Sequence, residues 1–354
     1  MITGRSISAK LRALIACSLF GAWALSTAGC GHAPPKTDAA VPTQKPTPKL
    51  RRDRVGAEPA SSIPAHDALI SALSFSPDGR LLATASDDAS VKLWELSKRS
   101  IKCEMKQAYA ITAAALSPDG KAILTGSATV KVGDVTAATK GELLLWDATT
   151  CGQIRSFFGD LHLVDDAAFS PDGKLVACLE ARTHKAKLVD VPSGAVIRAV
   201  DAGEAGDPSL AFFPDGKTLA IGSDDGIELW DVGSGAHRGT IDFSAERIAI
   251  SPDGKLLAAA ADAEVRFYGP DGEAIRVLKA LGETSGALAF TPDGRRLASG
   301  GADQSIRIWS VPEGELLQTL RAHDEEVTAL AFSADGQTLA SGDRAGTVFL
   351  WAVE

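Results

Sequence analysis

Phe75-Ser76-Pro77-Asp78-Gly79 is the first of seven similar pentapeptides in this 354-residue chain. The others are Leu116–Gly120, Phe169–Gly173, Phe212–Gly216, Ile250–Gly254, Phe290–Gly294 and Phe332–Gly336. Pro fixes φ at the second turn position, Asp tolerates the bridge-region backbone conformation at the third, and Gly accepts positive φ at the fourth. This combination favours a type I turn. Recurrence at intervals of about 40 residues predicts a repeated structural unit.

Apolar runs flank each pentapeptide. Leu73 and Phe75 alternate with small residues before the first turn, and Leu81–Thr84 follows it, which predicts a β-hairpin. A further β run follows in each unit: Val91–Trp94, Leu143–Trp146, Ala186–Val189, Ile227–Trp230, Val265–Tyr268, Ile306–Trp309 and Val348–Trp351. A weaker fourth run, such as Gly314–Leu320, completes four strands per unit.

These turns, together with the terminal Trp and the Asp or Glu that follows it in several units, resemble the WD-repeat family over residues 58–354. The resemblance implies an all-β, seven-bladed propeller of four-stranded antiparallel blades. The chain ends on a third strand, so we expect Glu58–Ile63 to supply the missing outer strand and close the ring, as in resembling proteins. A strand that covers the open edge of the last blade prevents that edge from pairing with another chain.

The resemblance also implies a hydrogen-bonded set inside each blade. In the first blade its members are His66, Thr84, Asp88 and Trp94. A buried indole N–H needs an acceptor, so we interpret this His, hydroxyl and carboxylate as structural and not as a catalytic triad. No other catalytic or metal-binding motif is found, so we expect no cofactor and no metal.

Two other blades keep part of the set. Ser299, Asp303 and Trp309 lack a His in the sixth blade. The seventh has His323, Ser341 and Trp351, with Ala345 in place of the Asp.

The N-terminus predicts export. Residues 1–29 carry three basic residues, no acidic residue and a short apolar run that ends in small residues, as in a signal peptide. Thr27-Ala28-Gly29-Cys30 resembles a bacterial lipobox, which implies lipidation of Cys30 and an outer-membrane or periplasmic location. Thr27 stands where the lipobox usually has Leu. An ordinary cleaved signal, an uncleaved anchor and a cytoplasmic protein are the alternatives.

Residues 30–57 are rich in Pro, Thr and Lys and predict a disordered tether. The remaining residues, 58–354, hold 27 Lys and Arg against 43 Asp and Glu, a formal charge of −16. Nucleic acid requires a basic surface, so the composition argues against it as a partner. Three cysteines lie in this part. Cys103 and Cys151 either pair or remain thiols, and Cys178 lies on an apolar strand.

Two features are candidates for binding a protein or peptide partner. One is an insertion, residues 127–140, that contains Lys131, Asp134 and Lys140. Loops that exceed their scaffold often carry binding. The other is a set of acidic residues expected in loops of one face: Asp87, Asp165, Asp166, Asp224, Asp225, Glu325 and Glu326.

The expected function is a lipid-anchored protein-interaction scaffold without catalysis. The alternative is a propeller enzyme, a hydrolase, lactonase or oxidoreductase, with its site at the central mouth of the ring.

Overall fold

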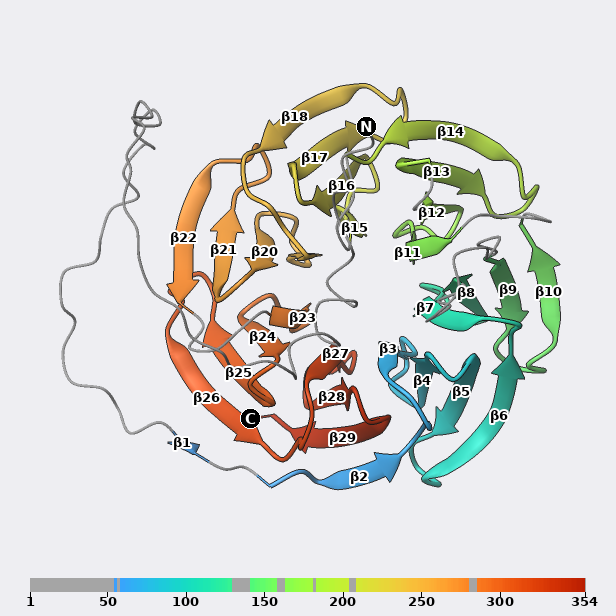
Figure 1. Ribbon diagram of the computed structural model, residues 1–354, viewed down its shortest axis with the longest axis vertical. Coiled ribbons are helices and arrows are strands. Elements are labelled where there is room, and N and C mark those ends of the chain that lie inside the picture. The colour runs from blue at the N-terminus through green and yellow to red at the C-terminus, as the bar shows by residue number, and fades with distance from the viewer. Residues whose placement is uncertain are drawn as a thin grey trace, which may run out of the picture. The chain divides into compact units, whose positions relative to one another are not determined.

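The computed structural model describes residues 54–55, 58–128, 141–157, 163–180, 183–203, 208–279 and 285–353. Within these ranges all regular structure is β, and seven sheets form a ring of blades, which confirms the predicted propeller (Figure 1). In blades one to six, each innermost strand pairs with the next along the chain, and the order continues outward to the fourth strand.

The first three blades comprise β3 (Ile70–Phe75), β4 (Leu81–Ser86), β5 (Ser90–Glu95), β6 (Ser100–Lys106), β7 (Ala110–Leu116), β8 (Ala122–Ala128), β9 (Leu143–Asp147), β10 (Gln153–Ser156), β11 (Val164–Phe169), β12 (Leu175–Glu180), β13 (Lys185–Asp190) and β14 (Val196–Asp201). Blades four and five comprise β15 (Ser209–Phe212), β16 (Thr218–Ser223), β17 (Gly226–Asp231), β18 (His237–Ile241), β19 (Arg247–Ile250), β20 (Leu257–Ala261), β21 (Glu264–Tyr268) and β22 (Ala274–Lys279). Blade six has β23 (Ser285–Phe290), β24 (Arg296–Gly301), β25 (Ser305–Ser310) and β26 (Leu316–Arg321).

Each pentapeptide forms the turn between the first two strands of its blade. In the first, the Ser76 hydroxyl donates to the Asp78 carboxylate at 2.6 Å, and the same carboxylate accepts the Arg80 N–H at 3.1 Å. These bonds hold the pKa of Asp78 below its ordinary value. Gly79 takes φ +67°, which explains why glycine recurs there.

The hydrophobic core consists of layers between neighbouring blades. Leu93 of blade one and Ile123 of blade two are both fully buried in one such layer. Equivalent layers join each following pair, and the last contains Ile70, Ala340 and Val348 from blades one and seven. Each blade therefore depends on its neighbours, because neither face of its sheet is covered by its own residues.

The ring closes as predicted. Blade seven contains β27 (Val327–Phe332), β28 (Thr338–Asp343) and β29 (Thr347–Ala352), and its outer strand is the N-terminal β2 (Ser61–Pro64). β2 pairs antiparallel with β29, with Ile63 opposite Val348 (Figure 1). A second N-terminal strand, β1 (Arg54–Val55), lies parallel to β26 of blade six, within the stretch expected to be tether.

Successive turns also approach one another closely around the ring. A Cβ placed on Gly120 would lie 3.0 Å from Cδ of Pro77 in the preceding turn. The same contact recurs in the pairs Pro118–Gly173, Pro171–Gly216, Pro214–Gly254, Pro252–Gly294 and Pro292–Gly336. Ala334 replaces the seventh Pro, and a Cβ at Gly79 would meet nothing within 4 Å. The seam between blades seven and one therefore lacks this contact.

We expect Ala334→Pro to stabilise the protein by about 1 kcal/mol, because Pro restricts the unfolded chain where the turn already suits it. The measurement is the midpoint of urea unfolding. Ala331→Pro, inside β27, is the matched control and should destabilise. A lower midpoint for Ala334→Pro would show that this turn differs from the other six.

Candidate functional site

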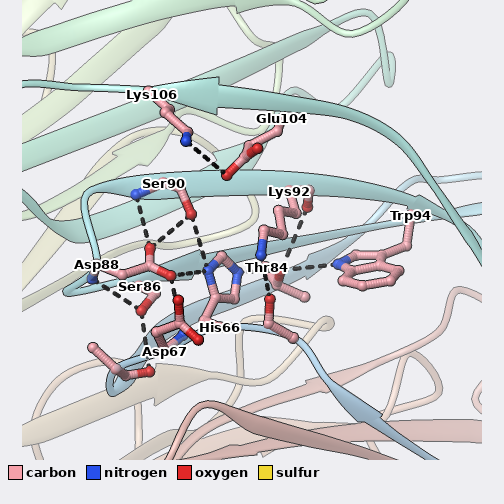
Figure 2. Close-up of polar contacts among 12 residues, drawn as sticks. His66, Asp67, Thr84, Ser86, Asp88, Ser90, Lys92, Trp94, Glu104 and Lys106 are labelled. Atoms are coloured by element: carbon pink, nitrogen blue, oxygen red, sulfur yellow. Dashed lines mark hydrogen bonds and ion pairs between the residues drawn. The ribbon is translucent and has the colours of Figure 1, made fainter.

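The four side chains singled out in blade one are hydrogen-bonded to one another (Figure 2). Nδ1 of His66 lies 2.9 Å from the Asp88 carboxylate, and Nε2 lies 2.7 Å from the Thr84 hydroxyl. The Trp94 indole donates to the same hydroxyl at 3.0 Å. With Nδ1–H donating to Asp88, Nε2 accepts from Thr84, so every bond has one donor and one acceptor.

The environment of this set favours a neutral imidazole. Burial lowers the pKa of His66, although Asp88 opposes that shift. Burial alone would raise the pKa of Asp88, but hydrogen bonds from Ser90 and His66 outweigh it and leave the pKa below its ordinary value. The Thr84 hydroxyl is fully buried and already receives the indole N–H, so it cannot meet a substrate. The set fastens the strands of the blade together.

Thr84→Val should lower the free energy of unfolding by about 2 kcal/mol, because it keeps the side-chain shape but leaves the Trp94 N–H without its acceptor. Thr84→Ser is the matched control, since it keeps the hydroxyl and should cost clearly less. Thermal and chemical unfolding of both variants measures the difference. Equal losses would show that packing, and not the hydroxyl, holds Trp94.

Blade seven forms a similar set with a different carboxylate. Ser341 accepts the Trp351 indole N–H at 2.8 Å and lies 2.6 Å from Nε2 of His323. Ala345 does replace the expected Asp, but Asp343, two residues earlier, lies 2.7 Å from Nδ1 of His323. Sequence reasoning missed Asp343 because this residue ends β28, two residues before the position at which the repeat alignment places the Asp.

Blade two also contains a residue that sequence reasoning missed. The Gln107 amide donates to the Thr125 hydroxyl at 2.9 Å, which also accepts the Trp146 indole N–H. Gln107 precedes Ile111 by four residues, as His66 precedes Ile70, and this spacing could have identified it.

Blade six keeps its Ser299–Trp309 hydrogen bond at 2.9 Å. In blade four an Ile, Ile221, stands at the hydroxyl position, and the buried indole N–H of Trp230 has no partner among the described residues.

The predicted acidic residues lie at one end of their strands. Asp87 follows β4 and the Asp224–Asp225 pair follows β16, whereas the other four lie at or just before the start of innermost strands β11 and β27. Because neighbouring strands are antiparallel, the end of a second strand lies beside the start of a first strand. We call the loop surface that bears them the acidic face: Asp87, Asp165, Asp166, Asp224, Asp225, Glu325 and Glu326.

The members of the acidic face differ in exposure and role. Asp224, Asp225 and Glu325 are exposed, and Glu326 pairs with Arg344 at 3.1 Å. Asp166 instead accepts the Leu210 N–H of the next blade at 2.9 Å, and burial raises its pKa despite that bond. Asp166 therefore ties blade three to blade four, whereas Asp224, Asp225 and Glu325 are the exposed members of the acidic face.

Several predicted residues lie outside the described ranges. They are Cys30 and the insertion residues Lys131, Asp134 and Lys140. Within the described ranges no cluster of three or more His, Cys, Asp or Glu side chains suits a metal ion. No helix among those residues is long and apolar enough to span a bilayer.

The structure decides between the alternatives left open for the cysteines. Cys103 in β6 and Cys151, after β9, form a disulfide between blades one and two. Cys178 is a buried free thiol whose pKa burial raises to about 12, so it stays protonated and unreactive.

Comparison with known proteins agrees with this architecture. A family model described as "WD domain, G-beta repeat" matches residues 57–95, 208–231, 275–310 and 314–352. The chain is 25% identical to "Pre-mRNA-processing factor 19 homolog 2" of Arabidopsis thaliana over 272 residues, which is 73% of this chain and 50% of the relative.

Two other curated relatives match shorter shares of their own length. The chain is 25% identical to "Transcriptional corepressor LEUNIG_HOMOLOG" of Arabidopsis thaliana over 67% of this chain and 29% of the relative. It is 32% identical to "Protein groucho" of Drosophila melanogaster over 29% of this chain and 15% of the relative. The chain thus spans half or less of the length of these three relatives.

Proposed function

Because this chain is a seven-bladed propeller, four parts of which match the WD-domain family model, we propose that it is an exported, lipid-anchored scaffold that holds a basic protein or peptide on its acidic face. The relatives carry names as different as a pre-mRNA-processing factor and a transcriptional corepressor, and no single reaction unites these names. What they share with this chain is the repeat. A propeller built from this repeat is suited to binding other proteins, and this fits a non-catalytic role.

We choose the acidic face as the binding surface because Asp224, Asp225 and Glu325 are exposed there, in loops of blades four and seven. The part after the tether has a formal charge of −16, so the long-range field attracts basic partners. Binding through exposed carboxylates weakens as salt screens them. We therefore propose a partner segment rich in Lys or Arg.

Two features support export. The N-terminal residues resemble a lipoprotein signal that ends at Cys30, and the disulfide joins cysteines 48 residues apart in the chain. Disulfides persist in oxidising compartments and are uncommon in the cytosol. The disulfide is independent of the signal resemblance, so the two observations reinforce each other.

Photo-crosslinking from defined positions tests the face. A photo-reactive residue at Asp224 or Glu325 should crosslink a partner in cells, and the yield should fall at high salt. The same residue at Lys174 or Lys255, which are exposed beside the pentapeptide turns, is the matched control and should crosslink nothing. Equal yields from the two sets of positions would overturn the acidic-face proposal.

Intact mass tests the anchor. We expect the mature chain to begin at an acylated Cys30 and to fractionate with membranes, and Cys30→Ser to abolish both. An unmodified chain that begins at Met1 in the cytosol would refute export.

A further inference from the structure

An arginine on the outer strand of blade two reaches the next blade. The Arg155 guanidinium in β10 donates to the carbonyl oxygens of Pro192 and Ser193, at 2.9 and 2.7 Å. Both carbonyls belong to the turn between β13 and β14 of blade three. A fork of two hydrogen bonds from one guanidinium fixes the orientation of the turn as well as its distance.

The same arrangement occurs farther round the ring. Arg198 in β14 donates to two carbonyls of the corresponding turn in blade four, both at 2.6 Å. In blade five the contact is one of packing: the Cδ of Arg276 in β22 lies over Gly314 of blade six, where an added Cβ would come within 2.6 Å of it. We call these three contacts the outer clamps.

The clamping residue has a fixed place in its blade. It lies two residues after the outer-strand residue that pairs with the Trp position: Arg198 follows Val196, which pairs with Val189, and Arg276 follows Ala274, which pairs with Tyr268. In blade one the residue paired with Trp94 is Ile101, so the same place falls on Cys103. A cysteine therefore stands where other blades have arginine.

The disulfide partner also occupies the clamped turn. Cys151 has φ +61°, a conformation that Gly194, Gly235 and Gly314 take at the corresponding place in their turns, with φ of +75°, +72° and +71°. Left-handed φ is unfavourable for a residue with a side chain, and glycine is the usual choice. Two blades have a residue with a side chain at this place: Arg99 in blade one, with φ +50°, and Cys151 in blade two, where the clamp is a covalent bond.

We propose that the Cys103–Cys151 disulfide is the covalent member of the outer clamps, and that the redox state of this bond controls local opening at the outer edge of the seam between blades one and two. Reduction by a dithiol breaks the S–S bond. Each sulfur gains one electron and one proton to become a thiol, and the dithiol is oxidised to its own disulfide. Both cysteines are half-buried, so a small dithiol can reach them. The other clamps contain no sulfur and stay closed.

Blade four provides an internal reference. Gly239 stands at the clamping place, two residues after His237, which pairs with Trp230. A Cβ at Gly239 would meet nothing within 4 Å, so the seam between blades four and five has no outer clamp.

Hydrogen exchange on the full chain, with and without dithiothreitol, tests the proposal. Reduction should release two thiols per chain and speed exchange in β6 and the turn over residues 147–152 by at least about tenfold. The turns clamped by Arg155 and Arg198 should not change. Unaltered exchange at residues 147–152, or faster exchange spread evenly over all blades, would overturn the proposal.

A pair of double variants tests whether the clamps are equivalent. Cys103→Arg with Cys151→Gly should rebuild an arginine clamp and give slow exchange whether or not dithiothreitol is present. Cys103→Ala with Cys151→Gly is the matched control and should exchange as fast as the reduced chain. If both variants exchange at the same rate, the two kinds of clamp are not equivalent. If the control does not fold, the oxidised and reduced wild-type chains still decide the redox proposal.

Discussion

Deleting residues 58–64 is expected to lower the melting temperature of the protein by about 10 °C. These residues form the outer strand of blade seven, whose four-residue ladder with β29 includes the contact of Ile63 with the core beside Val348. Losing this ladder and the apolar burial costs roughly 4 kcal/mol. In a domain of this size each kcal/mol shifts the melting temperature by about 2–4 °C.

The matched control for this deletion removes residues 36–42 instead, which shortens the chain equally and leaves β2 in place. We expect the control to melt with the wild type. Scanning calorimetry measures both. If the two deletions melted together, β2 would contribute nothing to closure, and the apolar layer between blades seven and one would hold the ring alone.

Asp343→Ala is expected to lower the free energy of unfolding by about 3 kcal/mol. The Asp343 carboxylate is buried and accepts hydrogen bonds from the Ala345 and Thr347 N–H groups, at 3.0 and 2.9 Å, as well as from His323. Alanine leaves the buried His323 without its acceptor and removes both backbone bonds, and an unpaired buried donor costs about 1–3 kcal/mol, whereas water can reach the exposed Ala345 N–H.

Asp343→Asn separates charge from hydrogen bonding. Its amide oxygen can still accept from the backbone, so we expect a loss of about 1 kcal/mol in chemical denaturation. A loss as large as that of Asp343→Ala would show that the negative charge beside His323 matters more than the bonds to the loop.

The turns show how far local chemistry specifies this protein. Ser76, Pro77, Asp78 and Gly79 each satisfy one demand of a single turn, and the hydrogen bonds that result join residues at most five apart. Such contacts are fixed by neighbours in the chain, so their repetition predicted the hairpins, the blades and their number. Counting strands left the last blade one strand short, and the family resemblance implied that the N-terminal strand completes it.

The sequence by itself thus determined the repeated turns and strands, because they follow from a pattern that recurs about every 40 residues, and its resemblance to a known family implied the ring, the closing strand and the hydrogen-bonded residues of blade one. Only the tertiary structure paired Cys103 with Cys151, placed Asp343 beside His323 and assigned Asp166 to the joint between two blades. The disulfide and the Asp166 joint link different blades, whereas the Asp343–His323 contact depends on where β28 ends within blade seven. No local pattern encodes these contacts, because the disulfide and the Asp166 joint arise only when the blades pack into the ring and the Asp343–His323 contact joins residues 20 apart in the chain.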